Sequence, residues 1–170
     1  MARRPRDIGT DAERAVVRVL RASGWPHAER RALRGSADAG DITGTPGIVW
    51  EVKGGNTARR SSDYQVEAWL VETEQERRNA GADIGVLVVQ RAGVGPANAH
   101  RWWAVIPAGS LARLLQGEQA QVDGLHIPVR MILGDLLGVL RAAGYGDPLP
   151  AAPAAGAPGL AATCAPEVVA

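Results

Sequence analysis

Cysteine, histidine and lysine are all scarce in this chain, and each shortage limits the kinds of site it can form. The single cysteine, Cys164, allows neither a disulfide framework nor a zinc cluster. The three histidines, His27, His100 and His126, are far apart in the sequence and share no metal-ligand spacing. Any bound metal is therefore expected to have oxygen ligands.

Long hydrophobic runs are also missing. No apolar run approaches the roughly 18 residues that a membrane-spanning helix needs. The basic start, Met1 to Arg6, is followed by a polar, amphipathic stretch and not by the apolar core of a signal peptide. These features predict a cytoplasmic protein that does not enter a membrane.

The length and the proline distribution predict one domain and a tail. A chain of 170 residues suits a single ordinary domain. From residue 147 onward the chain holds five of its eleven prolines, much alanine and no aromatic residue. Such a segment buries too little apolar surface to offset its ordering entropy. We therefore expect a domain over residues 1–146 and a disordered Ala/Pro-rich tail over residues 147–170.

Basic charge is concentrated in the first part of the chain. Residues 1–60 carry twelve Lys and Arg against seven Asp and Glu, whereas residues 61–170 carry seven against eleven. This asymmetry suits a polyanionic substrate that meets the first third of the fold, although an ordinary surface asymmetry also explains it. Of the nineteen basic residues only Lys53 is a lysine.

Hydrophobic periodicity and turn residues predict the order α-βββ-α-ββ-α-β-α. Helices are expected where apolar residues recur at helical spacing, namely at residues 10–23, 61–80, 110–116 and 135–143. Strands are expected where short apolar or alternating runs lie between turn signals, namely at residues 27–33, 38–43, 47–53, 84–89, 102–106 and 126–133. The predicted fold class is a mixed α/β sheet flanked by helices.

The second and third of the predicted strands carry the chemistry of a possible site. Glu51 and Lys53 are two residues apart on one strand, so both side chains leave the same face, while Trp50 and Val52 can pack into the core on the other. Asp41 lies ten positions before Glu51 on the neighbouring predicted strand. A hairpin register would bring the two carboxylates together.

Two carboxylates and one backbone carbonyl form a hard-oxygen site of the kind that holds Mg²⁺. Asp41, Glu51 and the carbonyl of Val52 are the predicted ligands, and Mn²⁺ is an alternative metal. Hydrolysis of a phosphodiester needs an activated water and stabilisation of growing negative charge, which such a metal supplies. The ammonium group of Lys53 would add charge stabilisation or help to position the nucleophile.

The pattern Gly40-Asp41-Ile42 followed by Glu51-Val52-Lys53 resembles the PD-(D/E)XK nuclease superfamily, and within it the archaeal-type Holliday junction resolvases. The preceding Glu13 and the segment Arg34-Gly35-Ser36 add to the resemblance, which spans roughly residues 9–90. Gly40 stands where the family usually has proline. Some phage-encoded resolvase-like nucleases with a Trp-Trp strand are also similar, which would place the protein in a host cytoplasm.

The resemblance implies a restriction-endonuclease-like core, metal binding by Asp41 and Glu51, catalytic assistance by Lys53, and a helical Glu13 that completes the site. It implies an endonuclease that cuts branched DNA, with a homodimer presenting two copies of the site to two strands. A restriction-type or end-processing nuclease uses the same core, and so would a catalytically silent DNA-binding module. An assembly protein in which Glu51 and Lys53 merely pair is the remaining alternative.

Several individual residues permit two interpretations. Glu13 is either a site residue or the second half of a helix-capping pattern that begins at Thr10. Asp38 is a possible substitute for Asp41, but strand alternation puts it on the opposite face. Trp102 and Trp103 either stack on bases or form one core and one rim tryptophan.

Polar residues near the motif are candidates for contacts with nucleic acid. Arg31 and Arg34 lead into Ser36, where a phosphate near the scissile bond could be bound, although such a run is usually a solvated turn. Gln65, near the start of the second predicted helix, would reach the metal site or would simply be an exposed helix residue.

Overall fold

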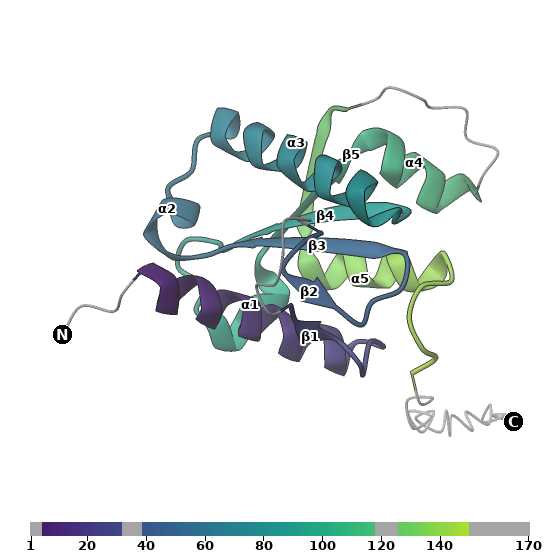
Figure 1. The fold of residues 1–170 in the computed structure, drawn as a ribbon, viewed down its shortest axis with the longest axis horizontal. Coiled ribbons are helices and arrows are strands. Elements are labelled where there is room, and N and C mark those ends of the chain that lie inside the picture. The colour runs from purple at the N-terminus through teal and green to yellow at the C-terminus, as the bar shows by residue number, and fades with distance from the viewer. Residues whose placement is uncertain (1–4, 32–38, 118–125, 150–170) are drawn as a thin grey trace, which may run out of the picture.

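A four-stranded mixed sheet forms the centre of the computed structural model, which describes residues 5–31, 39–117 and 126–149 (Figure 1). β3 (Ile48–Lys53) and β4 (Ile84–Val89) run parallel, while β5 (Trp103–Pro107) and β6 (Pro128–Ile132) continue the sheet with antiparallel pairing. All six residues of β4 are buried, as expected for a continuous β-branched and leucine run at the centre of a sheet. The structure thus confirms a mixed α/β fold with helices on its faces.

Helices cover both faces of this sheet. α1 (Pro5–Ala22), the 3₁₀ helix η1 (Pro96–Arg101) and α5 (Leu133–Ala142) pack on one face, in the larger of two hydrophobic clusters. α2 (Gly55–Arg59) and α3 (Asp63–Ala80) cover the other face, which we call the α3 face. α4 (Ala108–Gln116) lies against β5, β6 and α5. No helix among the described residues is long and apolar enough to span a membrane.

The alternation along β3 fixes which side chains reach which face. Ile48, Trp50 and Val52 enter the larger cluster, where Trp50 meets Trp25 edge-on at 6.5 Å between ring centroids. Edge-to-face packing is a favoured arrangement of aromatic rings, and Trp50 is fully buried. Because these residues anchor one face, the side chains of Glu51 and Lys53 point out of the other, the α3 face. The sequence predicted that these two side chains share the face opposite Trp50 and Val52.

The first two strands of the predicted meander are present, but over the described residues they are much shorter than predicted. β1 (Glu29–Arg30) and β2 (Ile42–Thr43) are two residues long and form a separate antiparallel pair. Glycine turns explain the shortening of β2: Gly40 has φ +85° and Gly44 has φ +77°, so the extended backbone is interrupted on both sides. Residues 32–38, with the alternative ligand Asp38, lie outside the described residues.

The capping pattern at Thr10 is also wrong. α1 begins at Pro5, a residue that suits the first helical position because the amide hydrogen it lacks would have no helical partner there. Thr10 and Glu13 therefore lie inside the helix and not at its start. By contrast, Ser62 caps α3 by accepting a 3.2 Å hydrogen bond from the Gln65 amide, and Gly81 ends that helix with φ +61°.

Sequence analysis missed α2 and η1, two short helices in turn-rich segments, and placed other boundaries a few residues away. The predicted tail begins at residue 147, but residues 147–149 are described and residues 150–170 are not.

Replacing Trp50 should destabilise the fold strongly. We expect Trp50→Ala to lower the free energy of unfolding by about 3–5 kcal/mol, because the change leaves a cavity where the fully buried indole of β3 packs. Tyr64→Ala removes a ring that is 81% exposed and should change stability by less than about 0.5 kcal/mol. Urea denaturation of both variants measures the contrast, and equal losses would contradict the assigned role of Trp50.

Candidate functional site

Asp41 lies against the outer edge of β3, the edge that does not pair with β4. Its backbone amide donates to the Trp50 carbonyl at 2.8 Å, and the Val52 amide donates to its carboxylate Oδ2 at 2.8 Å. The preceding Gly40 allows this approach, because a Cβ there would lie 2.7 Å from Val49 Cγ1 and 2.9 Å from the Trp50 oxygen. Its φ of +85° is also unavailable to proline, so the local backbone conformation explains why glycine stands at this position of the motif.

Glu51 and Lys53 form an ion pair on the α3 face of β3. Lys53 Nζ donates to Glu51 Oε1 at 2.5 Å, and the Glu72 carboxylate of α3 lies 3.6 Å from the same nitrogen. Nζ also lies 5.7 Å from the centroid of the Trp69 ring, within the range of a cation–π contact. The ammonium is therefore held over the end of β3 by contacts from two elements.

Glu13 reaches the same region from α1. Its Oε2 accepts a 2.5 Å hydrogen bond from Arg30 Nε, and the Arg30 NH2 group lies 3.4 Å from the Thr10 hydroxyl. The Glu13 side chain is 16% exposed, and its charge raises the pKa of Asp41. The structure thus brings Glu13, Asp41, Glu51 and Lys53 together, although Arg30 holds Glu13.

Burial and mutual repulsion perturb the carboxyl groups. Desolvation, followed by the charge of Glu51, raises the pKa of Asp41 to about 7, against the lowering effect of the Val52 amide hydrogen bond. Burial likewise raises the pKa of Glu51, although Lys53 opposes that shift. Burial lowers the pKa of Lys53, but its hydrogen bond to Glu51 and the charges of Glu51, Glu72 and Asp41 outweigh this and raise it. Lys53 is therefore a cation at neutral pH.

The donor set at this edge fits a hard divalent cation. Asp41 and Glu51 supply carboxylates close enough to share a hydrogen bond. The Val52 amide points to Asp41, and in an extended strand the carbonyl of the same residue points to the same side, so the predicted third ligand faces this edge too. In the part of the chain that the structure describes, no three His, Cys, Asp or Glu side chains form a metal-holding group. Two carboxylates and the Val52 carbonyl nevertheless match Mg²⁺, which often uses one or two carboxylates and keeps several waters.

The predicted contacts with nucleic acid have mixed outcomes. Arg31 is exposed, and its backbone amide donates to the Asp41 carbonyl at 2.7 Å, so it adjoins the site. Gln65 lies in the first turn of α3, partly buried, one helical turn before Trp69. Arg34 and Ser36 lie outside the described residues. Trp102 is fully buried and donates to the Val94 carbonyl, whereas Trp103 is partly exposed, which confirms one core and one rim tryptophan.

Sequence analysis missed the contribution of α3. Trp69 and Glu72 contact Lys53, and the charge of Glu76 raises the pKa of Glu51. These residues are three and four positions apart, so they share one helix face, and that spacing was a readable signal. What the sequence could not give is which strand this face covers.

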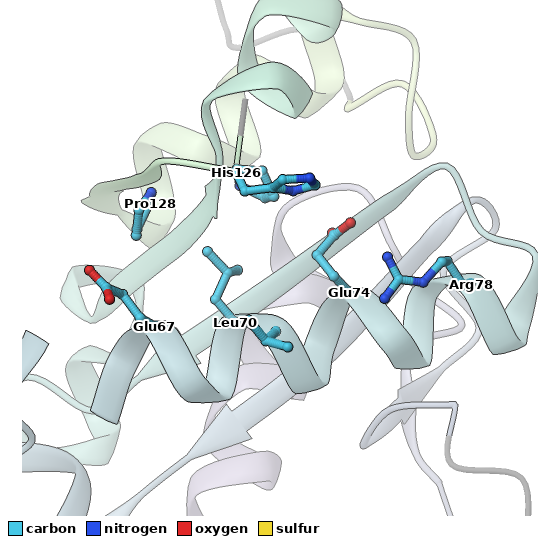
Figure 2. Close-up of a pocket in the computed structure, with 8 residues that line it drawn as sticks. Glu67, Leu70, Glu74, Arg78, His126 and Pro128 are labelled. Carbon is cyan, nitrogen blue, oxygen red and sulfur yellow. The ribbon is translucent and has the colours of Figure 1, made fainter. Parts of the chain in front are cut away.

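A pocket of about 400 Å³ lies on the flank of α3 that faces β5 and β6 (Figure 2). Leu70, Glu74 and Arg78 of α3 line it together with His126 and Pro128. None of the predicted site residues lines this pocket, so it is separate from the carboxylate site at the outer edge of β3.

Comparison of the chain with protein-family models, with curated proteins and with solved structures found no match.

The raised pKa of Asp41 predicts a pH-dependent stability when no divalent cation is bound. The carboxyl of an unfolded chain titrates near 3.8, and that of the folded chain near 7, so folding favours the protonated form. This contribution is complete below the unfolded pKa and is lost as the pH rises through the folded one. We expect Asp41→Asn to be more stable than wild type at about pH 8 in EDTA, by on the order of 1 kcal/mol, with the advantage vanishing toward about pH 4.

Denaturant titrations at several pH values measure this difference, with Asp135→Asn as the matched change at an exposed position. A constant difference between wild type and Asp41→Asn across the range would show that the carboxyl is not perturbed.

Proposed function

We propose that the protein is a divalent-metal-dependent DNA endonuclease of the PD-(D/E)XK type, with a restriction-endonuclease-like core and branched DNA as its substrate. One observation carries the proposal: Asp41 and Glu51, which are ten positions apart, lie side by side at one strand edge with Lys53 bound to Glu51. The mixed sheet, with α1 on one face and the α3 crossover on the other, supports it.

The metal would be held by Asp41, Glu51 and the Val52 carbonyl, and Mg²⁺ or Mn²⁺ suits these ligands. When bound, such a cation supplies Lewis acidity and a lowered pKa for water. The chain's own contribution is positional. The Val52 amide orients the Asp41 carboxylate, and Trp50 and Val52 anchor the strand from the opposite face.

Lys53 has the role of charge stabilisation. Its pKa is raised, so it remains protonated and offers hydrogen bonds to phosphoryl oxygens on which negative charge grows. Binding of a cation to Glu51 would compete with the Glu51–Lys53 hydrogen bond and release Nζ toward the substrate. Arg30 neutralises the charge of Glu13, so this carboxylate repels an approaching phosphate less.

Cleavage of two strands of a junction requires two copies of the site, and a homodimer is the simplest way to provide them. A restriction-type or end-processing nuclease of the same core is the alternative within enzymes. An assembly protein in which Glu51 and Lys53 merely pair is favoured by one feature, the ion pair between Lys53 Nζ and Glu51 Oε1.

Cleavage of a labelled four-way junction, a linear duplex and a single strand, each in Mg²⁺ or EDTA, tests the function. Asp41→Asn and Lys53→Ala should each lower Mg²⁺-dependent cleavage by at least about 100-fold, because one loses a ligand and the other the charge that stabilises the phosphoryl oxygens. Asp135→Asn, an exposed carboxylate on α5, should cleave like wild type.

Symmetric nicking of the junction alone supports the resolvase. Equal cleavage of the linear duplex keeps the nuclease and removes the junction preference. Binding without cleavage in either metal transfers the argument to the silent module.

Metal binding itself predicts a thermal shift. Mg²⁺ or Mn²⁺ at about 100 times its dissociation constant should stabilise wild type by about 2.7 kcal/mol, because the cation binds the folded chain and relieves the repulsion between Asp41 and Glu51. Differential scanning fluorimetry should show no such shift for Asp41→Asn. A shift of equal size in that variant would place the cation elsewhere.

A further inference from the structure

A row of paired residues crosses the sheet from Lys53. Lys53 lies opposite Val89, and Val89 lies opposite Trp103. The three side chains therefore point out of the α3 face in one row across the strands. Neighbouring strands are about 4.8 Å apart, which puts Trp103 roughly 10 Å from Lys53. Trp103 therefore stands beside the candidate site, where β3 and β4 end.

Two guanidinium groups flank the Trp103 ring. Arg91 Cζ lies 4.5 Å from the ring centroid and Arg130 Cζ lies 6.0 Å from it, both within cation–π range. Arg91 lies two residues after the end of β4, whereas Arg130 belongs to β6. We call these three residues the arginine–tryptophan cluster. Contact with the ring restricts both side chains, so a ligand that binds them loses less side-chain entropy.

The cluster borders a pocket of about 290 Å³ at the surface. Arg59 of α2 and the Ser61 side chain also line it, and no carboxylate is among the described residues that do so. Arg130 does contact Asp63 at 3.2 Å, but the Asp63 side chain is 90% exposed. An exposed pair of this kind contributes about 0–1 kcal/mol, so a phosphate can replace it.

We propose that this pocket binds a phosphate of the DNA strand that continues from the scissile bond. The proposal rests on the nuclease function. The planar forks of guanidinium groups match phosphate oxygens with two hydrogen bonds each. A separation of roughly 10 Å is within the span of a few successive phosphates of one strand, so one strand can reach Lys53 and the pocket together.

A purely structural role for the cluster gives a different expectation. In that role Arg91 only covers the Trp103 ring and closes the smaller hydrophobic cluster, to which the ring belongs. Glutamine keeps part of the apolar stem but loses the charge. Under the structural role, Arg91→Gln and Arg130→Gln would therefore alter stability and leave DNA affinity unchanged.

The test is DNA binding in EDTA, measured by fluorescence anisotropy at a series of salt concentrations with labelled duplex and junction. The double variant Arg91→Gln/Arg130→Gln should bind about tenfold more weakly, with the slope of log K against log salt reduced by about 0.9 for each lost contact. Arg113→Gln is the matched control, because Arg113 is an exposed arginine in a pocket where β4 begins. It should bind with the wild-type slope.

Wild-type affinity and slope in the double variant would overturn the proposal. An equal loss of affinity in Arg113→Gln would also overturn it, because that result would indicate a general electrostatic attraction of the protein for DNA and not a phosphate site. Cleavage in Mg²⁺ separates the two proposals. If the cluster variants lose binding while wild type binds but never cuts, the phosphate site stands and the nuclease fails. If wild type cuts and the double variant binds normally, the nuclease stands and the phosphate site fails. Absence of any binding at low salt removes both.

Discussion

The hydrogen bond from the Val52 amide to the Asp41 carboxylate holds the candidate site in place. It satisfies a donor at the outer edge of β3, which pairs with no further strand among the described residues, and it fixes a carboxylate beside Glu51. The same bond lowers the pKa of Asp41, yet burial and the neighbouring charges outweigh it. Asp41 is therefore held where its ionised form is disfavoured.

This arrangement concentrates negative charge in a small, partly dry region. Glu13, Asp41, Glu51 and Glu72 come from α1, the β2 approach, β3 and α3, and two cations, Arg30 and Lys53, counter them. Because each carboxylate comes from a different element, the rigid packing of the two hydrophobic clusters holds the charges together against their repulsion. Groups with strongly perturbed pKa values often mark functional sites for this reason.

Sequence alone gave the strand that carries the site, because the alternation of Trp50 and Val52 with Glu51 and Lys53 reports both faces directly. The role of Glu13 stayed open between a site residue and a helix cap, since a local capping pattern at Thr10 is indistinguishable from a mid-helix Thr and Glu until the helix start at Pro5 is known. Short strands bounded by glycines were overextended, because their length depends on turn geometry.

Contacts between elements could not be read from the sequence. The placement of Glu72 and Trp69 over Lys53 depends on how α3 crosses the sheet, and the row from Lys53 to Trp103 depends on strand order. Local patterns specify faces of elements, whereas register and neighbours arise from tertiary packing. The resemblance likewise rests on the motif and its spacing, and not on these contacts.

The sheet has two outer strands, and each is protected from pairing with a foreign strand in its own way. At β3 the segment around Asp41 covers the edge. At β6 the edge carries Pro128, which has no amide hydrogen to donate, and the exposed charge of Arg130. In the part of the chain that the structure describes, both outer edges therefore disfavour pairing between the sheets of two copies.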